Sequence, residues 1–190
     1  MLACEEKAVS PMVDKTYIPE GEVPPASQIG ATLEALGATI AARREAGEGS
    51  YTYRLLTGSV DGVLKKVMEE AGEVALAAKD VEGWATSSLA AAVALDAAAN
   101  GAGAGTGPVD AAGALADSDA LSVQLPPEYG EAVDHLRYEA ADVVYHLLVV
   151  LERYGISLDE FAAELNNRMT DEERPAGAVR LHGEYVRRGK

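Results

Sequence analysis

The stretch EAVDHLRYEAADVVYHLLVVLER, residues 131–153, carries the strongest periodic pattern in the chain. Apolar side chains recur in it every three or four residues, which is the spacing of one face of an α-helix. This apolar face is broad, so we expect the helix to lie at the centre of the core. Gly155 should end it, because a glycine just past a helix readily takes the left-handed conformation. The apolar positions are Val133, Leu136, Ala140, Val143, Val144, Leu147, Leu148 and Leu151.

Two segments upstream repeat apolar residues at the same helical spacing, and we expect helices over residues 29–46 and 60–79. Between them, SYTYRLLT, residues 50–57, is expected to be a short ordered connection. Further along, residues 84–99 are rich enough in alanine and leucine to form a helix as well. The predicted helices therefore occupy much of the chain before the central stretch.

A last helix is predicted over residues 158–169, because Ser157-Leu-Asp-Glu160 matches a capping box. In this motif the serine side chain accepts a hydrogen bond from the backbone amide of the glutamate, and the glutamate side chain accepts one from the amide of the serine. Both amides would otherwise lack a partner at the start of the helix. The motif therefore fixes where this helix begins.

The composition favours helices packed on helices. Aromatic residues make up 5% of the chain and the hydrophobic set 48%, so the core must be built from alanine, valine and leucine. We expect an all-α fold, a bundle of four to five helices in one domain over residues 29–170. Residues 1–28 are expected to be a flexible leader, the Ala/Gly-rich range of about 81–133 a solvated insertion between the two acidic helices, and residues 171–190 a mobile tail.

The chain is strongly acidic, with a formal net charge of -15. This charge repels nucleic-acid backbones and anionic membranes, so neither is expected as a partner. A phosphorylated small molecule is still a suitable substrate if a divalent cation lies between the negative groups. The single cysteine, Cys4, excludes an intrachain disulfide, and no apolar run outside the Ala/Gly-rich tract is long enough for a transmembrane helix. These features predict a cytoplasmic protein.

Two groups of carboxylates lie on predicted helices. Glu69, Glu70 and Glu73 are three and four residues apart, which places them near one stripe of their helix. Glu139 and Asp142 interrupt a helix that is otherwise largely apolar, so they should lie close to the core. Carboxylates in such a place take up protons or bind a cation. Their oxygen ligands suit magnesium, with manganese as the alternative, although the first group can also be read as a solvated acidic face.

Several basic side chains lie near these carboxylates. Lys65 and Lys66 precede the first acidic group by one turn, and they either contact substrate phosphates or pair with the neighbouring glutamates. His135 and His146 share a stripe with the second acidic group. Each can donate to a phosphate or orient a carboxylate, with a buried and hydrogen-bonded histidine as the alternative. Arg54 is a further candidate for a phosphate contact, or a surface ion-pair residue.

Three segments carry a resemblance to a known family: SYTYRLL, DGVLKKVMEEAGEVALAAKD and YEAADVVYHLLVVLERYGISLDEFAAELNNR. They resemble the phosphoribosyl-ATP pyrophosphatases of histidine biosynthesis, which belong with the MazG-like enzymes and the dimeric dUTPases to the all-α nucleotide pyrophosphohydrolases. The resemblance covers about residues 29–80 and 134–169. It implies a MazG-like fold, a small-molecule nucleotide substrate, and hydrolysis of phosphoribosyl-ATP to phosphoribosyl-AMP and pyrophosphate.

The resemblance also implies roles for individual residues and a homodimer. The acidic residues would hold magnesium and orient or activate the attacking water, and the basic residues would stabilise charge on the phosphates. Relatives pair their helices into dimers, so a homodimer with a composite site is expected. The expected metal ligands are Glu70, Glu73, Glu139 and Asp142, the expected catalytic residues are Glu69, Glu70 and Glu73, and the expected substrate contacts are Lys65, Lys66, Arg54 and His146.

Two other interpretations are left open by the residues. One is a house-cleaning pyrophosphatase that uses the same metal site on non-standard nucleoside triphosphates. The other is a helical interaction protein without catalysis, in which the acidic stripes are simply solvated. Assays on a panel of nucleotides separate the first from the expected enzyme, and magnesium binding separates the second.

Overall fold

The structure is a computed structural model that describes residues 15–99, 123 and 125–187. Within these residues there are five α-helices and one short 3-10 helix, and no residue lies in a β-strand, which confirms the all-α prediction. The elements in chain order are α1 (Gln28–Ala42), η1 (Arg43–Glu45), α2 (Tyr51–Thr57), α3 (Val60–Ala99), α5 (Pro127–Arg153) and α6 (Leu158–Asn166).

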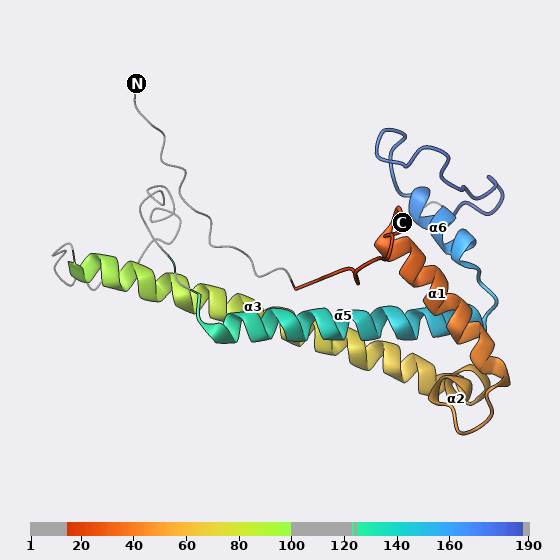
Figure 1. Ribbon diagram of the computed structural model, residues 1–190, viewed down its shortest axis with the longest axis horizontal. Helices are drawn as coiled ribbons and strands as arrows, with labels where there is room; N and C mark the ends of the chain where they lie inside the picture. The colour runs from red at the N-terminus through yellow and green to blue at the C-terminus, as the bar shows by residue number, and fades with distance from the viewer. Residues whose placement is uncertain (1–14, 100–122, 124, 188–190) are drawn as a thin grey trace.

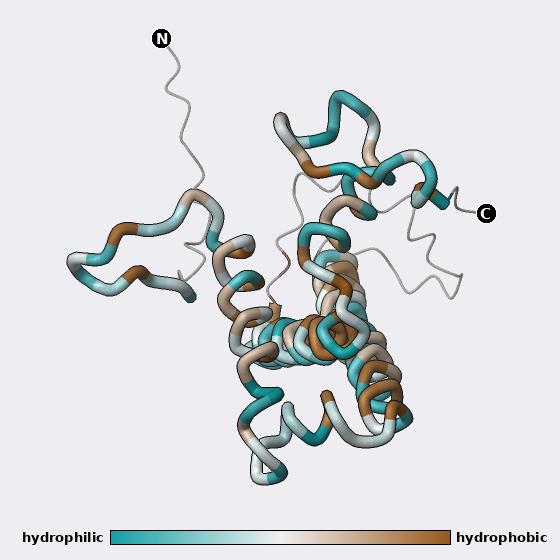
Figure 2. Tube along the Cα trace, turned by 90° about the vertical axis from the view of Figure 1, so that its right-hand side faces the viewer, coloured by the Kyte–Doolittle hydropathy of each residue, from teal (hydrophilic) through white to brown (hydrophobic). Residues whose placement is uncertain are grey.

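The two longest helices, α3 and α5, lie side by side and run in opposite directions (Figure 1). The shorter helices α1, α2 and α6 gather at the end of this pair where α3 begins and α5 finishes (Figure 1). Figure 2 views the molecule from that end and shows hydrophobic residues on the helices at its centre. The buried core lies at this end, where α1, α2, α3 and α5 meet. It consists of Ile40, Leu55, Leu56, Val63, Leu148, Val149 and Leu151.

Helix α2 corrects the expectation of a mere connection between the first two helices. The Ser50 side chain accepts a hydrogen bond from the backbone nitrogen of Tyr53 at 3.3 Å and so caps the helix. Leu55 and Leu56 on its inner face are buried in the core. A helix of seven residues is too short to be stable by itself in water, so this tertiary packing holds it together. The sequence pattern alone is too short to reveal it.

Helix α3 is much longer than the segment predicted for it. It runs over 40 residues without a break, so the separately predicted helix over residues 84–99 is its second half. Helix α5 begins at Pro127, a residue that is well suited to the first turn because its missing amide would have no partner there. Both helices thus extend into the range expected for the insertion. The Gly-rich tract lies in residues 100–122, outside the described residues.

The ends of α5 and α6 follow the predicted signals. Gly155 has a φ of +68° just after α5, and the capping box of Ser157 and Glu160 is present with both hydrogen bonds. Helix α6 ends at Asn166, three residues before the predicted end at Met169. Helix α1 ends at Ala42, and the last residues of its predicted range continue as the tighter turn η1. These differences of a few residues are typical of helix ends, which fray or tighten.

The segments outside the helices are anchored at defined points. The Lys15 ammonium nitrogen lies 2.6 Å from a carboxylate oxygen of Asp134 on α5, so the described part of the leader contacts the helix pair. After α6, the Arg174 guanidinium donates to the backbone carbonyls of Asn166 and Met169 at 2.8 and 2.7 Å. These bonds satisfy carbonyls at the end of α6. In the part of the chain that the structure describes, no helix combines the length and apolar content needed to cross a membrane.

Candidate active site

Three carboxylates meet where α3 and α5 face each other. Glu70 comes from α3, and Glu139 and Asp142 come from successive turns of α5. One oxygen from each of the three lies within 4.8 Å of the others. Glu70 and Glu139 are only 4% and 7% exposed. Buried carboxylates so close together repel each other and lose hydration, so the arrangement suits a bound cation.

Glu73 adjoins this group from the next turn of α3. A hydrogen bond with Glu70 is the main cause that raises the pKa of the Glu73 carboxyl above its ordinary value, and burial and the negative charges of Glu70 and Glu139 add to the effect. The raised pKa shows that negative charge is concentrated at this point of the helix pair. Four of the predicted acidic residues are therefore brought together, three of them with oxygens in reach of one small ion.

Lys66 lies directly beside the carboxylates. Its ammonium nitrogen is 2.6 Å from an oxygen of Glu70 and 3.4 Å from one of Glu69. The hydrogen bond from Lys66 holds the pKa of Glu70 below its ordinary value, and the same bond raises the pKa of Lys66. Lys66 thus supplies a positive charge next to the buried Glu70 carboxylate. This charge allows Glu70 to stay ionised despite its burial.

Glu69 and Lys65 lie farther from the centre of the group. The Lys65 ammonium is 3.0 Å from a Glu69 oxygen, and the Lys65 side chain is 74% exposed. Hydrogen bonds from Lys65, and to a smaller extent from Lys66, lower the pKa of Glu69. Glu69 is therefore ionised at neutral pH and lies at the open side of the site.

His146 is buried between three helices. Its Nδ1 lies 2.9 Å from the backbone carbonyl oxygen of Asp142, so Nδ1 carries the proton and donates to that carbonyl. Its Nε2 lies 3.0 Å from the Tyr51 hydroxyl on α2, which donates to it. Nδ1 is also 3.8 Å from an oxygen of Glu70. Both ring nitrogens thus have protein partners, and the predicted contact of His146 with the substrate stays a prediction.

Two further basic residues lie around the site. His135 approaches the carboxylates one turn before Glu139, with its Nε2 2.9 Å from a Glu139 oxygen. Arg54 is exposed on α2, where its guanidinium donates to the Glu48 carbonyl at 2.8 Å and lies 6.0 Å from the centre of the Tyr51 ring. The predicted contact of Arg54 with a substrate phosphate stays a prediction.

Sequence reasoning did not assign a role to the side chains of α2 that contact the site. The Tyr51 hydroxyl reaches His146, and the Thr52 hydroxyl lies 2.7 Å from that of Tyr145. Burial raises the pKa of Tyr51, so its hydroxyl keeps its proton and can donate. The segment SYTYRLL is too short for its periodicity to predict the helix that makes these contacts.

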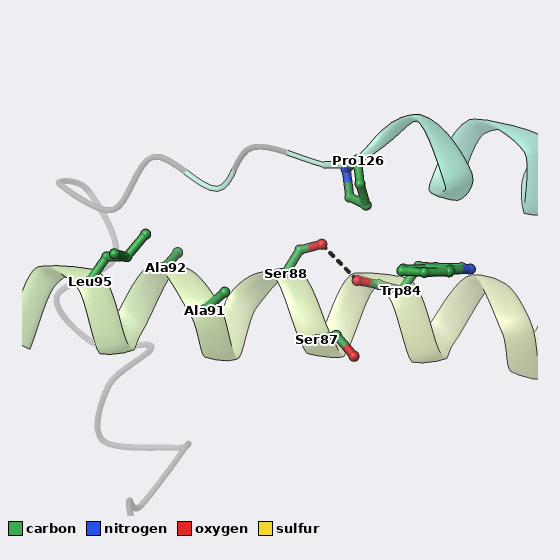
Figure 3. A pocket seen from close by; sticks show the side chains of 7 residues that line it. All are labelled: Trp84, Ser87, Ser88, Ala91, Ala92, Leu95 and Pro126. Carbon is green, nitrogen blue, oxygen red and sulfur yellow. Dashed lines mark hydrogen bonds between the residues drawn. The ribbon is translucent and has the colours of Figure 1, made fainter.

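A separate groove lies on the second half of α3, where α5 has not yet begun (Figure 3). The Ser88 hydroxyl donates to the Trp84 carbonyl at 2.8 Å, so it is bonded within its own helix. Among the residues that the structure describes, neither a carboxylate nor a histidine lines the groove, so it differs chemically from the acidic site. The described lining residues are Trp84, Ser87, Ser88, Ala91, Ala92, Leu95 and Pro126.

Comparison with known proteins finds one family for this chain. The family model described as phosphoribosyl-ATP pyrophosphohydrolase matches residues 33–169, which include all the carboxylates described above. The phosphoribosyl-ATP pyrophosphatase of Limosilactobacillus fermentum is 30% identical over 137 residues, which cover 72% of this chain and 82% of the relative.

Two further relatives agree with this match. The phosphoribosyl-ATP pyrophosphatase of Pyrobaculum islandicum is 32% identical over 63% of this chain and 74% of its own length. The histidine biosynthesis bifunctional protein HisIE of Deinococcus radiodurans is 51% identical over 59 residues, 30% of this chain and 27% of the relative. No solved structure gives a significant match.

Proposed function

Because the chain belongs to the phosphoribosyl-ATP pyrophosphohydrolase family, we propose that it hydrolyses phosphoribosyl-ATP to phosphoribosyl-AMP and pyrophosphate with a magnesium ion held between α3 and α5. The reaction is a step of histidine biosynthesis, in keeping with the names of the relatives. The observation that carries the chemistry is the buried group of Glu70, Glu139 and Asp142. These residues lie inside the region matched by the family model, which supports their assignment to the proposed reaction.

The donor set fits magnesium. All the groups are carboxylate oxygens, which hard divalent cations prefer, and the raised pKa of Glu73 reflects negative charge that a cation would neutralise. Glu70, Glu139 and Asp142 would hold the ion, with Glu73 beside them. When bound, the ion polarises phosphate oxygens and lowers the pKa of a bound water. Manganese, which accepts the same ligands, is the alternative.

The protein's own residues supply the remaining charges. Hydrolysis joins a water oxygen to the α-phosphorus and breaks its bond to the bridging oxygen, which leaves with pyrophosphate. Glu69 is ionised beside Lys65 and Lys66, so its carboxylate is suited to accept a hydrogen bond from the attacking water and orient it. Its lowered pKa makes it a weak base, so the proton that the water loses passes to solvent. The two lysines are proposed to contact the substrate phosphates, where their charges oppose those of the leaving pyrophosphate. Arg54 and His146 are retained as proposed substrate contacts.

Release of pyrophosphate from phosphoribosyl-ATP by the purified chain tests this proposal. We expect turnover with magnesium and none after chelation. A panel of ordinary, oxidised and deoxyuridine triphosphates should be hydrolysed far more slowly. Faster hydrolysis of the panel would favour a house-cleaning enzyme with the same site, and no turnover of any nucleotide would contradict a catalytic role. The predicted cytoplasmic location stays a prediction.

Magnesium affinity is expected to fall as the pH is lowered through the raised pKa of Glu73. Glu73 takes up a proton at a higher pH than an ordinary glutamate, whose pKa is 4.5, because Glu70 and Glu139 are close. Magnesium favours the ionised carboxylate, so binding should release a proton in this pH window. Calorimetric titration in buffers of different ionisation enthalpy measures that release. Glu73→Gln should abolish it, and an unchanged proton release in this variant would contradict the assignment.

A homodimer is proposed because α3 leaves large apolar side chains uncovered. Leu64, Met68 and Leu76 are 44%, 73% and 68% exposed, and their four- and eight-residue spacing runs along the helix. Pairing α3 with a second copy would bury them. We expect sedimentation of the wild type as a dimer at micromolar concentration and of Met68→Glu as a monomer. Leu95→Glu, at an equally exposed position (73%) farther along α3, should stay dimeric. A monomeric and active wild type would contradict the proposal.

A further inference from the structure

Helix α2 depends on other elements for its position. It has seven residues, and at its N-terminal end Tyr51 bonds His146, which lies beside Glu70, and Thr52 bonds Tyr145. An isolated helix of this length does not persist in water. Whatever holds its opposite end therefore also sets where the Tyr51 hydroxyl lies.

Arg153, at the last turn of α5, holds that opposite end. One of its guanidinium nitrogens donates to the backbone carbonyls of Leu55 and Leu56 at 2.8 and 3.0 Å, and the other donates to the carbonyl of Gly58 at 2.7 Å. The first two carbonyls are among those that a helix C-terminus leaves without partners. The positive charge also lies at the negative end of the helix dipole. Arg153 thus acts as a side-chain cap supplied by a different helix.

The turn after α2 is built around the same point. The amide of Gly58 donates to the Arg54 carbonyl at 2.9 Å, and a Cβ atom at residue 58 would lie only 2.6 Å from that carbonyl oxygen. Any side chain there would push the turn away from Arg153. The close approach and the three hydrogen bonds together define one position for the end of α2.

A path of contacts connects this end to the carboxylates. Both Arg153 and His146 belong to α5, two turns apart, and α2 lies across them. At the far end of α2, Tyr51 donates to Nε2 of His146, whose Nδ1 is 3.8 Å from Glu70. A shift of α2 would therefore break the Tyr51 bond and leave the imidazole beside Glu70 held only by its Nδ1 bond to the Asp142 carbonyl.

We propose that Arg153 is a positioning residue for the reaction: it fixes α2 against α5 and so keeps Tyr51 on His146 and the imidazole against Glu70. The inference rests on the proposed function for its catalytic consequence. Arginine is required because its planar fork reaches three carbonyls at once, whereas the single ammonium of lysine cannot. The effect passes through α2 rather than through direct contact with substrate.

A double-mutant cycle tests this route. Arg153→Gln and Tyr51→Phe are each expected to lower kcat/KM for pyrophosphate release by about 10- to 100-fold, the usual effect of losing a residue that orients a metal ligand. If both substitutions act through α2, the loss of kcat/KM in the double variant should not exceed the larger of the two single losses. Backbone amides of residues 53–56 should exchange with deuterium faster in Arg153→Gln than in the wild type. Arg153→Lys keeps the charge for folding and should show the same pattern with a smaller loss.

Arg44→Gln is the matched control. The Arg44 guanidinium also bonds a backbone carbonyl near the end of α5, that of Glu152 at 2.5 Å, and it donates to the side chain of the same residue at 2.8 Å rather than to α2. The kcat/KM of Arg44→Gln should stay within about twofold of the wild-type value, as expected for a surface substitution. Additive losses in the cycle, or equal losses in the Arg44 and Arg153 variants, would overturn the inference.

Failure of the proposed function would be visible separately. A wild-type chain that releases no pyrophosphate removes that function but leaves the exchange measurement intact. Unchanged exchange of residues 53–56 in Arg153→Gln and Arg153→Lys would then overturn the placement of α2. Faster exchange confined to these residues would support it.

Discussion

Replacing Glu139 by glutamine is expected to lower kcat/KM for pyrophosphate release by on the order of 10²- to 10³-fold, because a lost ligand removes several kcal/mol of charge stabilisation in the transition state. The glutamine has nearly the same shape and fits the same buried place. Removing one of three neighbouring negative charges relieves repulsion, so the metal-free variant should melt at or above the temperature of the wild type. Activity is measured with magnesium, and thermal stability is measured by melts in chelator.

Glu131→Gln serves as the control for this substitution. Glu131 lies on the same helix about two turns earlier and is exposed, outside the acidic group. Its replacement changes the charge of the chain by the same amount and should leave kcat/KM within about twofold, since surface changes of this kind have small effects. Full activity of Glu139→Gln would refute its assignment as a ligand. A drop of the melting temperature in chelator would instead indicate that Glu139 serves the fold.

Ile40→Ala is expected to destabilise the protein by about 2–5 kcal/mol, the range measured for truncating a buried isoleucine or leucine. Ile40 on α1 is 1% exposed and packs in the core with residues of α2, α3 and α5. The cavity left by the truncation cannot close, because four helices meet there. Chemical denaturation monitored by circular dichroism gives the change in the free energy of unfolding.

Ile29→Ala provides the comparison, since it is the same change on the same helix at a residue that is 68% exposed. Its effect should be within about 0.5 kcal/mol, as for most surface substitutions. Alanine has the higher helix propensity, so propensity alone would stabilise both variants. Equal losses for Ile29 and Ile40 would therefore contradict the special contribution of Ile40 to the core.

The sequence predicts most of the features that depend on periodicity. The central helix and the shared face of Glu139 and Asp142 follow from regular spacing, because residues three and four apart share a helix face. The capping box at Ser157 follows from its motif. The approach of Glu70 to Glu139 and Asp142 was implied by the resemblance to a known family. Resemblance to a known family supplied the substrate, which spacing alone does not reveal.

Features that depend on the third dimension were not predicted. Helix α2 is too short to show a pattern, and the bonds from Tyr51 to His146 and from Arg153 to Leu55 connect residues about a hundred positions apart. Only the packing of α2 against α5 brings them together. His146 has one contact of each kind: Asp142 lies one turn earlier on the same helix, whereas Tyr51 reaches the ring only through the packing of α2.

The long stretch of sequence between Glu70 on α3 and Glu139 on α5 affects the folding rate of the chain more than the geometry of the assembled site. Helices form within about a microsecond, but Glu70 can meet Glu139 only after a large loop has closed. Each doubling of that loop costs only about 0.6 kcal/mol of closure entropy. The pairing of the two helices is thus expected to be the slow step in folding, and a longer or shorter connection between Ala99 and Pro127 would mainly retard or accelerate it while the assembled carboxylates stay the same.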